Sequence, residues 1–170
     1  METSRARRQQ LIRQAEGYLE LGMHQHALVV LDKLGETSDL EIHASYLRGE
    51  SLRSLERYDE ALDEFLRAAE AVPDDIHIWL AVGWCYKRSG RIDLAIEALD
   101  KALAIEPGEA LIHYNLACYC SLAGDRAQAL HFLRQAFDID SHYRDLVDNE
   151  EDFDPIRQDP EFLALTIVIV

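Results

Sequence analysis

Residues 76–107 read IHIWLAVGWCYKRSGRIDLAIEALDKALAIEP, and this stretch decides the fold. Its first half predicts a helix from Ile76 to about Ser89, which ends at Gly90. In its second half, apolar residues recur at spacings of three and four, which is the pattern of a helix with one buried face. Pro107 closes the stretch, because proline cannot continue a helix interior. We therefore predict a hairpin of two helices here.

The same pattern recurs along the chain at a fixed period. Small residues 34 positions apart form one series, Ala27, Ala61, Ala95 and Ala129, and larger ones form another, Leu31, Phe65, Leu99 and Leu133. Small side chains let two helices approach closely, and the larger side chains fill the space between neighbouring hairpins. We predict four units, at 8–41, 42–75, 76–109 and 110–143, after an N-terminal extension, 1–7, and before a C-terminal region, 144–170.

The third unit resembles the tetratricopeptide repeat (TPR) pattern, through Trp79, Gly83, Tyr86, Ala95, Leu99, Ala102 and Pro107. The resemblance extends over residues 8–143. It implies an all-α fold, a TPR solenoid of four helix-turn-helix repeats that forms a right-handed superhelix with a C-terminal helical cap. The outer units depart most from the pattern. The first has Leu34 and Asp39 where a small residue and proline are usual, and the fourth has Ser141 in the proline position.

The segment DFDPIRQDPEF, residues 152–162, is similar to a segment that follows many TPR arrays. The resemblance implies a cap in which phenylalanine and isoleucine cover the open face of the last repeat. Physical reasoning agrees, because the end of a solenoid exposes an apolar face that must be covered.

The apolar tail, Ala164–Val170, is rich in β-branched residues and would be an aggregation hazard in water. One interpretation continues the helix that begins near Pro160 and packs it against Leu133 and Phe137. The other lets the tail reach a neighbouring molecule, which would make the protein a homo-oligomer.

TPR proteins bind other proteins in a concave groove lined by the first helix of each repeat, and the resemblance implies the same function here. Family groove positions, transferred to this chain, give a candidate partner-binding site of ten residues. They are His43, Tyr46, Arg53, His77, Leu80, Trp84, Lys87, Arg88, Tyr114 and Asn115.

The aromatic members of this set are expected to face outward, where they would anchor a partner segment. Arg53, Lys87 and Arg88 would favour a partner with acidic flanks, because they are basic groups in a strongly acidic chain. In the alternative interpretation, the groove arginines pair with Glu16, Glu20 and Glu50 and serve only solubility.

Some TPR proteins hold the terminal carboxylate of Hsp70 or Hsp90 chaperone tails in a clamp of basic and amide side chains. The clamp positions of the first three units here hold Ile12, Glu16, Leu47, His77 and Ala81. A glutamate at such a position repels a carboxylate. We therefore do not expect a chaperone tail as the partner.

The overall charge excludes further classes of partner. The chain has 17 Lys and Arg against 32 Asp and Glu, a net charge of −15 among 170 residues. Binding to nucleic acid or to an anionic membrane requires a surplus of basic side chains, so we expect neither partner. A helical-repeat RNA-binding protein is a remote alternative.

No catalytic motif is found, so we predict a non-catalytic scaffold or adaptor without cofactors. Cys118 and Cys120 point to different sides of a helix and cannot easily ligate one ion, so we expect no metal site. His43 and His77 share a groove position on adjacent units but would lie about 8–10 Å apart, which is too far for both to ligate one ion. Three cysteines do not form a disulfide framework, and no secretory signal is recognisable. We expect a cytoplasmic protein.

Overall fold

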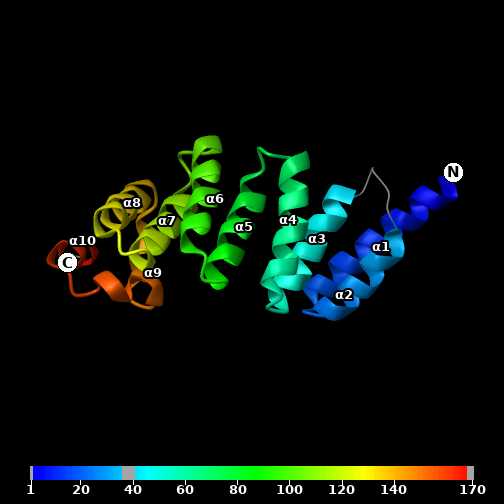
Figure 1. Ribbon diagram of the computed structural model, residues 1–170, viewed down its shortest axis with the longest axis horizontal. Helices are drawn as coiled ribbons and strands as arrows, with labels where there is room; N and C mark the ends of the chain where they lie inside the picture. Colours follow the sequence, from blue (N-terminus) through cyan, green and yellow to red (C-terminus); the bar gives the residue numbers. More distant parts are fainter. Residues whose placement is uncertain (1, 36–40, 168–170) are drawn as a thin grey trace. The chain divides into compact units, whose positions relative to one another are not determined.

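The computed structural model describes residues 2–35 and 41–167. All regular elements in these residues are helices, which confirms the all-α prediction. The chain divides into two compact units, residues 1–89 and 90–170. Figure 1 draws the first unit from blue to green and the second from green to red. The expectation about Asp39 lies outside the described residues.

Unit 1 contains five α-helices and one short 3₁₀-helix among its described residues. They are α1 (Glu2–Glu20), α2 (His24–Leu31), η1 (Asp32–Leu34), α3 (Glu41–Ser54), α4 (Tyr58–Ala71) and α5 (Ile76–Arg88). Helix α1 packs on α2 and α3 on α4, as expected for helical hairpins, while α2 also packs on α3 and α4 on α5. Because α1 begins at Glu2, residues 2–7 of the expected N-terminal extension continue directly into the first helix.

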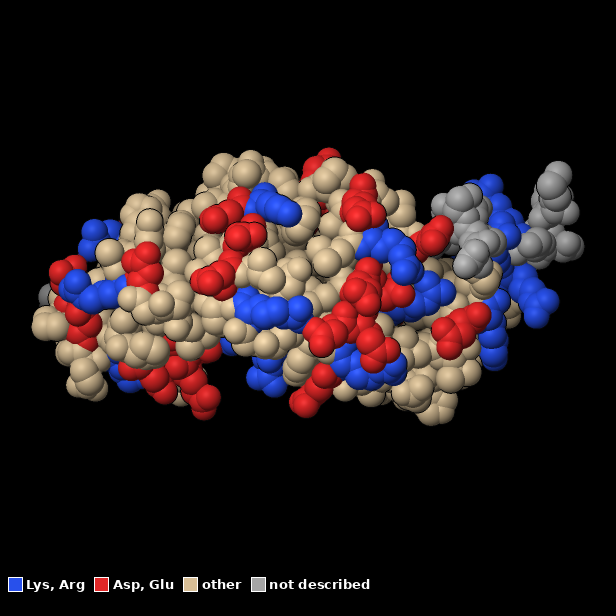
Figure 2. Space-filling model, in the orientation of Figure 1, with Lys and Arg blue, Asp and Glu red and all other residues tan. Residues whose placement is uncertain are grey.

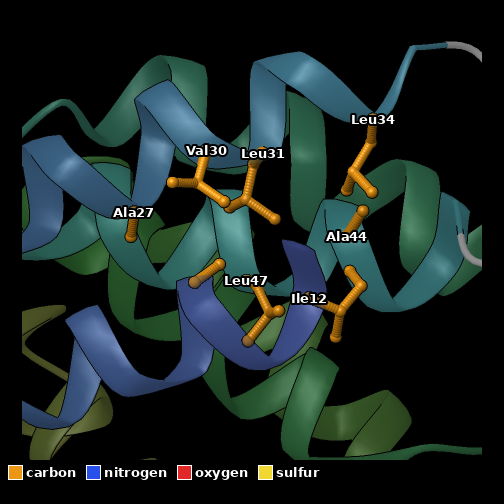
Figure 3. Close-up of a cluster of buried hydrophobic side chains, with 8 residues drawn as sticks. Ile12, Ala27, Val30, Leu31, Leu34, Ala44 and Leu47 are labelled. Atoms are coloured by element: carbon orange, nitrogen blue, oxygen red, sulfur yellow. The ribbon is translucent and has the colours of Figure 1, made fainter. Parts of the chain in front are cut away.

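The core at the start of unit 1 joins three helices (Figure 3). Ile12 from α1, Val30 and Leu31 from α2, and Leu47 from α3 converge there, and Leu31 has no exposed surface. Leu34 and the alanines at 15, 27 and 44 complete the cluster, and the alanines let the helices approach closely. The periodic small and large residues therefore occupy the interior that their spacing predicted.

Gly49 shows why one repeat position must be small. A Cβ atom added to this residue of α3 would lie 2.6 Å from Cε1 of Phe65 on α4. Phe65 is fully buried, so the ring cannot move into solvent. The same position of the last repeat holds Ala117 and the position of Phe65 holds Leu133, both fully buried. The smaller residue, Gly49, thus faces the larger side chain, Phe65, whereas Ala117 accompanies the smaller Leu133.

Among its described residues, unit 2 contains five α-helices, of which α9 and α10 are short, and two short 3₁₀-helices. In chain order they are α6 (Ile92–Ile105), α7 (Ala110–Leu122), α8 (Arg126–Ile139), η2 (Ser141–Tyr143), α9 (Arg144–Val147), η3 (Glu151–Ile156) and α10 (Pro160–Thr166). Helix α7 packs on both α6 and α8. Gly124 connects α7 to α8 with a φ of 81°, a conformation that glycine adopts without strain.

The C-terminal segment of unit 2 covers α7 and α8, as its resemblance to a cap implies. Element η3 packs on α7, and α10 packs on α8. Phe153, Ile156 and Phe162 are buried at 0%, 6% and 2% exposure. Arg126 of α8 donates to the Asp159 carboxylate and, from Nη2, to Glu161 Oε1 at 2.8 Å. Apolar burial and ion pairs therefore hold the segment in place.

The tail leaves the helix at its last described residues. Helix α10 ends at Thr166, and Ile167 is extended and 60% exposed. The Leu165 carbonyl oxygen accepts a hydrogen bond from Arg144 Nη1 at 2.6 Å. Residues 168–170 lie outside the described residues, so both interpretations of the tail stay predictions. No helix in the described part of the chain combines the length and the apolar character of a membrane span.

Candidate functional site

Eight of the ten candidate residues lie on two helices of unit 1. His43, Tyr46 and Arg53 belong to α3, and the other five, His77, Leu80, Trp84, Lys87 and Arg88, belong to α5. We call this area the α3–α5 surface. Tyr114 and Asn115 lie on α7 of unit 2 and are described separately below.

A cavity of about 440 Å³ opens where α3 and α5 begin. Its lining combines three candidate residues with apolar side chains and one carboxylate. The lining residues are Ile42, His43, Tyr46, Val72, Asp75, His77 and Ile78. The structure therefore brings His43, Tyr46 and His77 together around one space.

Local hydrogen bonds fix the polar rim of this cavity. Asp75 caps α5, and its Oδ1 accepts from the backbone N–H of His77 at 2.9 Å. His43 Nε2 lies 2.8 Å from Glu16 Oε1, which connects α3 to α1. Burial raises the pKa of the Tyr46 hydroxyl; Glu50 and Asp75 raise it further, while Arg53 opposes them. Tyr46 thus offers a neutral hydroxyl to the cavity at neutral pH.

A second group, the Trp84 cluster, lies toward the other end of the same two helices. It consists of Arg53, Tyr58, Trp84 and Arg88. The guanidinium carbons of Arg53 and Arg88 lie 5.1 Å and 5.6 Å from the centre of the Trp84 ring. The Tyr58 ring meets Trp84 edge-on at 5.6 Å between centroids, and its hydroxyl accepts from Arg88 Nε at 3.2 Å. The distances from the two guanidinium carbons to the Trp84 ring are those of cation–π contacts.

The alternative interpretation of the arginines is correct for one pair. Arg53 Nη2 donates to Glu50 Oε2 at 2.6 Å. The same guanidinium also lies over Trp84, so the pairing does not remove it from the cluster. Lys87 and Leu80 are half-buried on α5 beside these groups. On the face that Figure 2 shows, acidic and basic side chains lie interspersed among neutral ones.

The expectation that Tyr114 faces outward is wrong. Its side chain is only 5% exposed. Tyr143 of η2 and Phe153 of η3 cover it, with ring centroids 4.9 Å and 5.7 Å away. The family groove position does not account for these two elements, which fold over this part of α7. Asn115, the next residue, is half-buried.

Sequence reasoning missed Tyr58 and the apolar lining of the cavity. Tyr58 is the first residue of α4, and the groove positions were taken from first helices alone. Ile42, Val72 and Ile78 lie at helix ends or in the connection before α5, where no periodic pattern marks a site. Asp75 carried a usable signal, because an aspartate directly before an apolar helix predicts an N-cap.

Comparison with known proteins decides the family. Two tetratricopeptide repeat models match the chain, one at residues 46–110 and the other at 110–143, which together exceed half its length. The chain belongs to the tetratricopeptide repeat family. The first match includes α3 from Tyr46 onward and the whole of α5.

Solved TPR structures share the fold of this TPR chain. A fragment of MamA from Desulfovibrio magneticus RS-1 is 24% identical, with a TM-score of 0.75, over 79% of this chain and 76% of that one. YrrB, described as a TPR protein with an unusual peptide-binding site, is 23% identical, with a TM-score of 0.71, over 79% and 70%. At this identity the likeness establishes the solenoid fold.

Curated relatives are much longer proteins. BBSome complex member BBS4 of Bos taurus is 27% identical over 122 residues, which are 72% of this chain and 24% of that protein. The peroxisomal targeting signal receptor of Candida albicans is 32% identical over 78 residues, 46% of this chain and 13% of the receptor. This TPR chain therefore spans less than a quarter of the length of these relatives.

Proposed function

We propose that this chain is a non-catalytic protein–protein interaction adaptor that binds a peptide or partner segment on its α3–α5 surface. TPR membership supports a role in protein–protein interaction in general. One structural neighbour is described as having a peptide-binding site, and relatives are named as a complex member and as a receptor. The groups on the α3–α5 surface supply the specific support.

The Trp84 cluster carries the proposal. Trp84 is half-buried, so its indole presents apolar surface while neighbouring side chains hold it in place. Tryptophan and arginine are the residue types that contribute most to binding energy at protein interfaces. The guanidinium groups of Arg53 and Arg88 already lie against the ring, so a partner does not have to order them.

The cavity and the cluster together define the length of the partner segment. His43 borders the cavity and Arg53 belongs to the cluster, and both lie on α3. Ten residues of helix span about 15 Å. An extended peptide rises about 3.3 Å per residue, so about five residues would connect the two places.

The chemistry of the two places differs, which gives the segment a direction. Ile42, Val72 and Ile78 favour an apolar side chain in the cavity. Arg53, Lys87 and Arg88 favour carboxylates near the Trp84 cluster. The proposed partner therefore carries an apolar residue about five positions away from an acidic one.

A selection from a displayed peptide library, followed by affinity measurements on purified peptides, tests the proposal. Trp84→Ala is expected to weaken the selected peptides by about 30-fold, which corresponds to about 2 kcal/mol. Phe132→Ala, a half-buried aromatic on α8, is the matched control and is expected to leave affinity unchanged. Peptides that bind Trp84→Ala as tightly as the parent would contradict the proposal.

The electrostatic part has its own test. Arg88→Glu is expected to slow association of an acidic peptide and to reduce the salt dependence of its rate. Arg67→Glu makes the same charge change on the exposed side of α4, where Arg67 pairs with Glu64. Equal effects of the two substitutions would show that only net charge matters.

A further inference from the structure

Unit 2 brings a thiol and two carboxylates together where the C-terminal segment crosses α7. One oxygen each from Glu150 and Asp152 and the Sγ atom of Cys118 lie within 4.8 Å of one another. Cys118 is 2% exposed, and both acidic residues are half-buried. Glu150 is 32 residues away from Cys118 in the chain, so no local spacing in the sequence connects them.

The fold holds this group from both sides. Glu150 caps η3, and its Oε1 accepts from the backbone N–H of Asp152 at 3.2 Å. Its carbonyl oxygen accepts from Arg157 Nη2 at 2.6 Å. Phe153 follows directly and packs edge-on against the Tyr114 ring of α7 at 5.7 Å. These contacts position the two carboxylates against the helix.

The hydroxyl of Tyr114 supplies an independent observation. Tyr114 precedes Cys118 by four residues on α7, so the two side chains share one helix face. The ring is 5% exposed, and its buried hydroxyl has no hydrogen-bond partner in the structure. Tyr114 also contacts Phe153, the residue directly after Asp152, so its side chain lies beside the segment that carries the two carboxylates. A buried hydroxyl without a partner points to an acceptor that completes the site.

We propose that Cys118, Glu150 and Asp152 bind a zinc ion, and that a water molecule in the fourth position accepts the hydrogen bond of the Tyr114 hydroxyl. A thiolate ligand favours zinc over magnesium or calcium, and zinc takes four nitrogen, sulfur or oxygen ligands. Tetrahedral bonds of about 2.3 Å to sulfur and 2.0–2.2 Å to oxygen place the ligand atoms ~3.5 Å apart. The three ligand atoms lie within 4.8 Å of one another, so zinc binding requires them to move closer together.

Binding has a defined proton balance. The Cys118 thiol loses its proton to solvent, so one thiolate and two carboxylates face an ion of two positive charges. Tyr114 stays protonated, because the ligands already supply more negative charge than the ion carries. Affinity therefore falls as the pH is lowered, because protons compete with the ion for its ligands. The ion would join η3 to α7, so zinc is expected to stabilise the attachment of the C-terminal segment.

The direct test uses the full chain, freed of metal with a chelator and then titrated with zinc against a chromogenic chelator. One zinc per chain is expected. Cys118→Ala and Asp152→Asn are each expected to lower the affinity about 100-fold or more, and Tyr114→Phe about tenfold. Cobalt in place of zinc is expected to show a thiolate-to-metal absorption band that Cys118→Ala abolishes and Tyr114→Phe retains.

Two controls separate this site from adventitious binding. Cys120→Ala removes a second buried thiol of α7, and His142→Ala removes a surface histidine paired with Asp140 at 2.9 Å. Both are expected to keep the zinc affinity, and zinc is expected to raise the melting temperature of the parent but not of Asp152→Asn. Absence of micromolar binding, or binding that survives Cys118→Ala and Asp152→Asn, would overturn the proposal. Asp152→Asn keeps the test valid if Cys118→Ala does not fold.

Discussion

Tyr46 on α3 and Tyr114 on α7 occupy the same position of the repeat but have different surroundings. They are separated by two repeat periods of 34 residues, and each lies near the start of the first helix of its repeat. Tyr46 borders an open cavity, whereas Tyr114 lies under Tyr143 and Phe153. The repeat position therefore fixes which side of a helix a residue occupies, and the neighbouring segment fixes whether a partner can reach it.

The repeat position four residues further along shows the same contrast, here between α5 and α7. Trp84 is one period before Cys118. Trp84 is half-buried among two arginines, and Cys118 is buried beside Glu150 and Asp152. These positions of unit 1 are thus left partly exposed, as the proposed function requires, whereas the equivalent positions of unit 2 contact the chain's own C-terminal segment.

Removing the cover of Tyr114 gives the largest expected effect. Phe153 is fully buried and contacts the rings of Tyr114 and Phe162. Phe153→Ala is expected to lower the free energy of unfolding by about 3–5 kcal/mol, because it leaves a large cavity. Urea unfolding followed by circular dichroism measures this loss. Leu163→Ala, at a 40% exposed position of α10, is the control and is expected to cost much less. A loss below about 1 kcal/mol for Phe153→Ala would mean that the segment does not cover α7.

The close approach of Gly49 and Phe65 gives the next effect. Gly49→Ala is expected to cost about 1–3 kcal/mol of stability, because its Cβ meets the buried ring. Gly17→Ala in α1 is the matched control; no atom lies within 4 Å of its added Cβ, so it is expected to gain about 0.5–1 kcal/mol.

The comparison with unit 2 sharpens this prediction. Ala117 and Leu133 hold the equivalent positions of the last repeat. The double variant Gly49→Ala with Phe65→Leu reproduces that pair. Its loss of stability is therefore expected to be smaller than the sum of the losses of the two single variants. Strict additivity in the double-mutant cycle would show that the two positions do not contact each other.

The smallest expected effect is the pH dependence of the cap. Hydrogen bonds from Arg126 hold the pKa of Asp159 below its ordinary value, and the N–H groups of Phe162 and Glu161 act in the same direction. Because the folded pKa is lowered, this stabilisation is present above the unfolded value of about 3.9 and is lost as the pH falls through the folded pKa. Thermal melts of the parent and Arg126→Ala are expected to differ at neutral pH and to converge in acid. A constant difference at all pH values would contradict the assignment.

The sequence predicted the helical hairpins well because their signal is local and periodic. Ala61, Leu99 and Ala129 recur in register and are all buried in the structure. The candidate site was only partly predictable, because exposure depends on segments that are distant in the chain. Phe153 covers Tyr114 although it lies 39 residues further along the chain, and no periodic pattern predicts that contact. Tyr58 was missed because it begins a second helix, α4, and contacts Trp84 on the neighbouring helix α5.

The central claim is that one repeat position is open in unit 1 and closed in unit 2, and hydroxyl-radical footprinting tests it most directly. Tyr46 and Tyr114 have the same side chain, so their oxidation rates in one sample compare exposure without correction for chemical reactivity. Tyr46 is expected to oxidise several-fold faster than Tyr114 in the parent, and Phe153→Ala is expected to accelerate Tyr114 alone. Equal rates for the two tyrosines in the parent, or a faster rate for Tyr114, would contradict the account.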